Sequence, residues 1–232
     1  MGGVLSLTGN SPDAPTRVGV SIGDIGAGMF GVIGIQAALM ERARTGLGKH
    51  VDVAMLDSQV ALLENALVRY QVDGVVPGPI GSRHPSITPF GVFATQDGHI
   101  VLAAGNDKLF QRLLALLGLE HLSTDARFID NAARCVNHAA LKTELEGALA
   151  SHPSAHWQSL LEQAGVPTGP MNDIAAVMRD PQIQQRDMLM SLPVSKTQNL
   201  TIAGMPVKFQ GDTTAPATPA PHLDQDRKAL LQ

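Results

Sequence analysis

The stretch Val20-Ser-Ile-Gly-Asp24-Ile-Gly-Ala-Gly-Met29 decides how the first part of the chain folds. An acidic residue stands here between Gly23 and Gly26, directly before an apolar run of helical period. That period predicts a helix over residues 26–43. Gly46 follows the last basic turn of this helix, as is typical of a left-handed C-cap.

Asp24 has two compatible interpretations. The simpler one is a helix N-cap, in which the carboxylate accepts hydrogen bonds from the free N–H groups of the first turn. The other is a nucleophile, because a helix N-terminus stabilises a carboxylate and any anion bound beside it. The flanking Gly23 and Gly26 would let a bulky substrate reach the side chain. An exposed carboxylate held in this way can attack an acyl group.

The sequence pattern up to residue 72 predicts an α/β arrangement with an incomplete sheet. Gly28, Gly31 and Gly34 recur every third residue in the predicted helix, which indicates close approach of a backbone or ligand, since each glycine costs about 1 kcal/mol of helix stability. Residues 50–55 alternate polar and apolar, as in a half-buried strand, and residues 57–72 are predicted to be helical. A single strand cannot form a parallel sheet with covered faces. The sheet is therefore completed elsewhere in the chain or by residues upstream of it.

Proline and glycine divide the remainder of the chain. We predict a first domain over residues 1–72 and a linker over 73–89. A small α+β domain follows over residues 90–165. It begins with a hairpin around Asp97-Gly98 and continues with helices near residues 106–117, 138–150 and 154–164. A second linker is predicted over residues 166–190, and a last segment over 191–232.

Composition narrows the class of protein. Hydrophobic residues make up 44% of the chain and charged residues 16%, which is a globular composition. The net charge of −4 argues against nucleic-acid and anionic-membrane partners. The single cysteine, Cys135, excludes an internal disulfide and fits a reducing compartment. No uninterrupted apolar run reaches about eighteen residues, and the N-terminus lacks signal-peptide features, so we expect a cytoplasmic protein without a membrane span.

Several blocks along nearly the whole chain resemble, in the same order, the class III coenzyme A transferases of CaiB/BaiF type. That family includes formyl-CoA and carnitine-CoA transferases and the related α-methylacyl-CoA racemases. The blocks are Gly3–Gly9, Gly19–Gly28, Ala38–Gly48, Val51–Asp57, His84–Phe90, Thr95–Gly98, Gly105–Asp107 and Ala164–Pro170.

The resemblance implies a fold and a set of site residues. It implies a Rossmann-like large domain built from both chain ends, to which residues 191–232 return, and a small α+β domain on long linkers. Two protomers interlock as a homodimer in this family. The family's catalytic aspartate falls on Asp24, and a methionine that lines its CoA site falls on Met55. Gly23 and Gly26 lie beside the aspartate.

Candidate substrate-binding residues also lie in the first linker. The glycine-rich loop that covers the active site in some family members is reduced here to residues 77–81, which end at Gly81. Arg83 and His84 follow this loop and are candidates to reach an anionic ligand. The family implies no metal and no tightly bound cofactor.

The implied reaction moves coenzyme A from an acyl-CoA to a small carboxylic acid through aspartyl anhydride and aspartyl-CoA thioester intermediates. Two alternatives stay open. The first is a racemase-like epimerase that uses the same aspartate for proton transfer, and the second is a truncated, inactive chain that only folds or dimerises. Family members carry a further segment before the block that begins at Met1. It supplies much of the CoA contact and holds the racemase histidine, so the resemblance alone does not decide between them. The Ser21–Asp24 and Asn106–Asp107 blocks favour the transferase.

Overall fold

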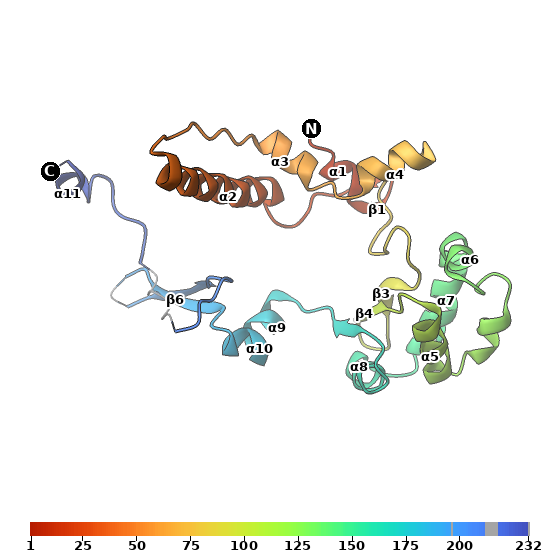
Figure 1. Cartoon of the computed structure of the whole chain (residues 1–232). Coiled ribbons are helices and arrows are strands. Elements are labelled where there is room, and N and C mark those ends of the chain that lie inside the picture. The colour runs from red at the N-terminus through yellow and green to blue at the C-terminus, as the bar shows by residue number, and fades with distance from the viewer. Residues whose placement is uncertain (196, 212–217, 232) are drawn as a thin grey trace. The chain divides into compact units, whose positions relative to one another are not determined.

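The computed structural model describes residues 1–195, 197–211 and 218–231, and Figure 1 shows its elements. The chain divides into two compact units, residues 1–170 and 171–232. The chain contains both helices and strands, which confirms the predicted mixed α/β class. Every strand pairing among the described residues is antiparallel, so these residues do not form the parallel sheet of a Rossmann-like domain. That large domain stays a prediction.

The first unit begins with a helical segment that carries Asp24. Its elements are α1 (Val4–Leu7), β1 (Gly9–Ser11), β2 (Ala14–Pro15), α2 (Ile22–Thr45), α3 (Met55–Ala61) and α4 (Ala66–Asp73). Helix α2 is longer at both ends than the predicted residues 26–43. It ends at Gly46, whose φ of 75° confirms the predicted left-handed cap.

The strand predicted at residues 50–55 is wrong. Residues 50–54 belong to no strand, and Met55 begins α3. A strand needs a hydrogen-bonding neighbour, and no strand of the described residues pairs with this segment. The single helix predicted over residues 57–72 is also wrong. It is split into α3 and α4 near Glu64, whose φ of 55° is left-handed and incompatible with a continuous α-helix.

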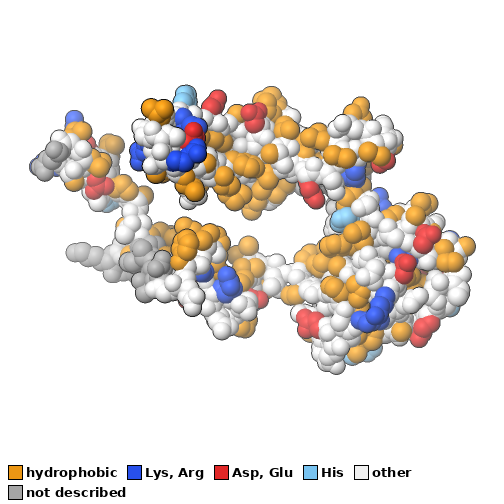
Figure 2. Space-filling model, in the orientation of Figure 1, with side chains coloured by type: hydrophobic (Ala, Val, Ile, Leu, Met, Phe, Trp, Pro, Cys, Tyr) orange, Lys and Arg blue, Asp and Glu red, His pale blue; other side chains and the backbone are white. Residues whose placement is uncertain are grey.

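Helix α2 exposes most of its apolar side chains. Only Gly26 is buried, whereas Val32, Ile33 and Met40 are 56%, 61% and 76% exposed. Figure 2 shows hydrophobic side chains along this helix. By length and composition alone α2 is able to cross a membrane, because an 18-residue window has a mean hydropathy of 1.5. Core helices of soluble proteins share this length and apolar composition, so these two features alone do not place α2 in a membrane. The absence of a membrane span and the homodimer both stay predictions.

The small domain contains the hydrophobic core. Its sheet has the order β3 (Phe90–Ala94), β4 (His99–Ala103), β5 (Thr168–Pro170), and the β3–β4 hairpin confirms the prediction. Strand β5 lies in the stretch that was predicted to be a linker, and it pairs with β4. All buried members of the core cluster lie between Phe93 and Val166.

Helices of the small domain complete this core. They are α5 (Asp107–Leu117), α6 (Asn131–Val136), α7 (His138–Leu149) and α8 (Ser154–Gln163), with a short 3₁₀ helix over Glu120–Thr124. Helix α7 buries Leu141, Leu145 and Leu149 at every fourth position, which is the pattern of one apolar face. The three helices predicted near residues 106–117, 138–150 and 154–164 are confirmed.

The second unit is smaller and more exposed. It contains α9 (Ile174–Arg179), α10 (Pro181–Gln185), β6 (Leu189–Pro193), β7 (Asn199–Ala203) and α11 (Arg227–Leu230). Strands β6 and β7 pair in antiparallel register, with Leu189 opposite Ala203. Much of the predicted linker over residues 166–190 is therefore regular structure rather than an irregular connection.

Replacing either of two glycines in the small domain with alanine should change stability, in opposite directions. A Cβ on Gly91 would lie 2.9 Å from the backbone oxygen of Ser82, a contact that only a backbone shift relieves. We expect Gly91→Ala to lower the free energy of unfolding by about 1–3 kcal/mol. Gly147, exposed within α7, has nothing from the described residues within 4 Å of its added Cβ. Gly147→Ala should raise stability by up to about 1 kcal/mol. Urea denaturation of the two variants measures both changes, and equal effects would contradict this account.

Candidate active site

Asp24 lies in the first turn of α2, and its side chain is exposed. The N-cap is Ser21 rather than Asp24, so the simple capping interpretation of Asp24 is wrong. The Ser21 hydroxyl accepts a hydrogen bond of 3.3 Å from Arg17 Nη2, which brings a positive charge to the start of the helix. The helix dipole is also positive at this end, so two features favour an anion beside Asp24.

Gly23 and Gly26 face helix α3 instead of open solvent. A Cβ added to Gly23 would lie 3.2 Å from Gln59 Nε2, and one added to Gly26 would lie 2.7 Å from Leu62 Cδ1. These two glycines therefore allow α2 and α3 to pack closely. This geometry does not support the hypothesis that the two glycines open a path for substrate.

Two other glycines, which lack side chains, lie beside Asp24 on helix α2. Gly28 and Gly31 follow Asp24 by four and seven residues, so all three lie on one face of α2. Nothing from the described residues lies within 4 Å of a Cβ added to either glycine. Among the described residues, nothing therefore covers the helix backbone at these two glycines next to the carboxylate.

Met55 is the first residue of α3 and is 51% exposed. Gln59 Nε2 donates a hydrogen bond of 3.4 Å to the Met55 carbonyl oxygen, and the same side chain lies against Gly23. Met55 and Asp24 thus lie in the first turns of two helices that are in contact. Gln59 contacts both helix starts. No sequence pattern marks this residue, because its role depends on how α2 and α3 pack.

The linker candidates lie in a second group. Gly81, with a φ of 71°, and Arg83 line one cavity, together with His138 and Lys142 of α7. His84 stacks on Phe90 with ring centroids 5.2 Å apart, and its Nδ1 accepts a hydrogen bond from the Ser86 backbone. No hydrogen bond or ion pair within residues 1–195, 197–211 and 218–231 joins this group to Asp24 or Met55.

The arrangement at Asp24 consists of an exposed carboxylate at a positive helix end, with open helix surface beside it. The sequence profile of CoA-transferase family III matches residues 1–227. The chain belongs to CoA-transferase family III. Its match covers the first unit and nearly all of the second.

Individual relatives agree with this assignment. The chain is 42% identical over 232 residues to the acetyl-CoA:oxalate CoA-transferase of Acetobacter aceti, covering 99% of this chain and 58% of the relative. It is 36% identical over 232 residues to the succinyl-CoA:mesaconate CoA-transferase of Haloarcula hispanica, covering 100% of this chain and 58% of the relative. The chain therefore spans a little over half the length of these relatives.

A solved structure shares the fold. The crystal structure of a CaiB/BaiF family protein from Brucella suis matches with a TM-score of 0.82 and 35% sequence identity. The match covers 99% of this chain and 60% of the other. The mixed α/β fold described above is thus the fold of this part of a CaiB/BaiF protein.

Proposed function

We propose that the protein containing this chain transfers coenzyme A from an acyl-CoA to a small carboxylic acid, with Asp24 as the nucleophile. The observation that carries the proposal is the position of Asp24, exposed in the first turn of α2 in a chain of CoA-transferase family III. The relatives carry transferase names, which favours transfer over the racemase alternative.

In the first half-reaction a carboxylate oxygen of Asp24 attacks the thioester carbonyl carbon. The carbon–sulfur bond breaks, coenzyme A leaves as a thiolate, and a mixed anhydride joins the acyl group to Asp24. The thiolate then attacks the Asp24 carbonyl carbon. The donor acid leaves as a carboxylate, and an aspartyl-CoA thioester remains.

The second half-reaction reverses these steps with the acceptor acid. The acceptor carboxylate attacks the aspartyl thioester and releases the thiolate, which then attacks the acceptor's carbonyl carbon in the new anhydride. The products are a new acyl-CoA and free Asp24. Covalent catalysis divides one difficult exchange into easier steps.

The protein's contribution is to hold the carboxylate and leave room beside it. Asp24 lies in the first turn of α2, where the positive end of the helix dipole favours a negative group. The open surface at Gly28 and Gly31 accepts the attacking thiolate and its pantetheine arm. Close packing of Gly26 on Leu62 fixes the helix that presents the nucleophile.

Chemical trapping tests the aspartyl thioester. Protein at the full length of its relatives is incubated with an acyl-CoA and then reduced with borohydride, which converts a thioester-bearing aspartate to homoserine. We expect peptide mass spectrometry to find homoserine at position 24 only when acyl-CoA is present. Homoserine elsewhere, or none during active turnover, would reject Asp24 as the carrier. The inactive-chain alternative predicts neither label nor turnover when the 232-residue chain is incubated by itself.

A further inference from the structure

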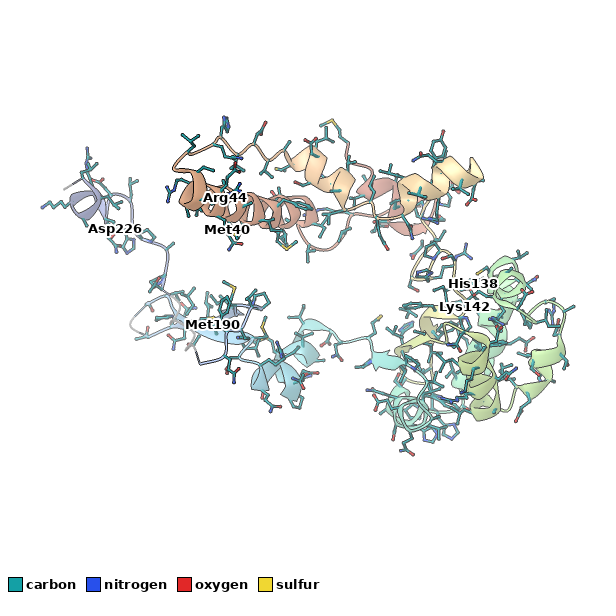
Figure 3. The ribbon with its side chains drawn as sticks, in the orientation of Figure 1. Met40, Arg44, His138, Lys142, Met190 and Asp226 are labelled. Carbon is teal, nitrogen blue, oxygen red and sulfur yellow. The ribbon has the colours of Figure 1, made fainter. Side chains whose placement is uncertain are left out.

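A cavity whose lining includes no residue of α2 gathers three basic side chains. It has a volume of about 280 Å³ and is lined by Arg83 of the linker and by His138 and Lys142 of α7. Ile80, Val92 and Phe93 add apolar surface. Figure 3 shows His138 and Lys142 on neighbouring turns of α7. Three basic groups from two separate segments therefore share one small, partly apolar space.

The positive charge in this cavity is only partly balanced. Lys142 Nζ donates to Glu146 Oε1 at 2.5 Å and to the Val92 carbonyl oxygen at 2.9 Å. Glu146 Oε1 also accepts a hydrogen bond of 2.7 Å from the Ala94 backbone, so the carboxylate is fixed. Arg83 has no hydrogen bond or ion pair from its guanidinium among the residues that the structure describes. One full positive charge is thus left without a partner of opposite sign.

His138 adds a group whose charge depends on its surroundings. It is the first residue of α7, and its Nδ1 is buried with no hydrogen-bond partner in the described part of the chain. Burial, and then the positive charges of Arg83 and Lys142, lower the pKa of His138, while Glu146 acts in the opposite direction. No hydrogen bond from the described residues satisfies this ring nitrogen, and an anion beside the ring would offset the positive charges of Arg83 and Lys142.

We propose that the cavity between the linker and α7 binds the oxyanion of a small ligand through Arg83, His138 and Lys142. A guanidinium matches a carboxylate or phosphate with two parallel hydrogen bonds. The apolar contribution of Ile80, Val92 and Phe93 favours an organic carboxylate over a bare inorganic ion. The site does not depend on Asp24 and does not rest on the proposed transfer reaction.

NMR of the histidine ring of the 232-residue chain tests the site. The His138 resonances, assigned with a His138→Gln variant, are followed while succinate, inorganic phosphate or neutral succinamide is added. We expect succinate to move the His138 signals in a saturable way and succinamide to leave them in place. A saturable effect of phosphate alone would assign the oxyanion to a phosphoryl group. No saturable shift with either anion, or an equal shift with succinamide, would overturn the proposal.

Matched variants separate the cavity from general charge effects. Arg83→Gln should weaken succinate binding at least tenfold, whereas Arg179→Gln, which removes an exposed arginine of the second unit, should leave it unchanged. Both variants keep Asp24, so this test is distinct from that of the transfer reaction. Thermal denaturation first establishes that each variant is folded. Equal affinities of the Arg83→Gln variant and the unaltered chain would refute the site.

Binding should also depend on pH. A bound carboxylate favours protonated His138, so the pKa of His138 should rise on binding, against the lowering caused by burial and by Arg83 and Lys142. By linkage, succinate affinity should increase as pH falls through the pKa of this ring, over the range in which succinate stays ionised. Calorimetric titrations at several pH values measure this. An affinity that is constant with pH, or that rises with it, would contradict a role for His138.

Discussion

Replacing Asp24 with asparagine is expected to lower CoA-transferase turnover by about a thousandfold or more, because the covalent pathway is lost rather than weakened. Asparagine keeps nearly the same size, and its amide still accepts hydrogen bonds at a helix start. The change therefore removes the nucleophile with little effect on α2. Turnover is measured with protein at the full length of its relatives, since the 232 residues cover 58% of the Acetobacter enzyme.

The neighbouring helix supplies a matched control. Asp57 is the third residue of α3, as Asp24 is the third residue of α2, and both side chains are exposed. Asp57→Asn removes the same charge from the same position of a helix. We expect it to change turnover less than tenfold. A comparable loss in both variants would show that a first-turn charge matters only for the fold, and near-normal turnover of Asp24→Asn would exclude covalent catalysis at this residue.

The small domain could be predicted from the sequence because its structure is local. The turn at Asp97-Gly98, the apolar period of α7 and the left-handed Gly118 and Gly165 each specify an element within a few residues. The core closes within residues 93–166, so these elements find their partners inside the chain. Strand β5 was missed because three residues containing a glycine and a proline carry no strand pattern of their own.

The helical segment around Asp24 was harder to predict, because its packing depends on residues far apart in sequence. The alternation at residues 50–55 resembles a strand, yet no strand among the described residues pairs with it. The role of Gly23 and Gly26 depends on Gln59 and Leu62, which only the packing of α3 brings close. The cluster at Arg83, His138 and Lys142 joins segments over fifty residues apart and has no motif in the sequence.

The second prediction with a large expected effect concerns Arg134 and the stability of the small domain. Its side chain is 1% exposed, and the guanidinium bonds to the Thr88 carbonyl oxygen at 2.9 Å, the Phe128 carbonyl oxygen at 3.1 Å and Asp107 Oδ1 at 2.6 Å. It also lies 4.4 Å from the ring centroid of Phe110. One buried side chain therefore joins the end of the linker to α5 and to the loop before α6.

We expect Arg134→Met to lower the free energy of unfolding of the small domain by about 3–5 kcal/mol, because it leaves buried acceptors without a donor. Trp157 is the only tryptophan of the chain and lies in the core cluster, so its fluorescence reports the unfolding of this domain in urea. Arg134→Lys should recover less than half of the lost stability, because a single ammonium group cannot reproduce the planar fork of donors that serves these three acceptors.

The exposed Arg127 separates this effect from the loss of an arginine in general. Arg127 also pairs with an aspartate, Asp125, at 2.7 Å, but it does so at the surface, where water replaces lost hydrogen bonds. Arg127→Met should therefore shift the urea midpoint far less than Arg134→Met. If the two variants unfold at the same urea concentration, the buried network at Arg134 does not hold the linker to the small domain. If only Arg134→Met is destabilised, the fold depends on this one guanidinium where the linker enters the core.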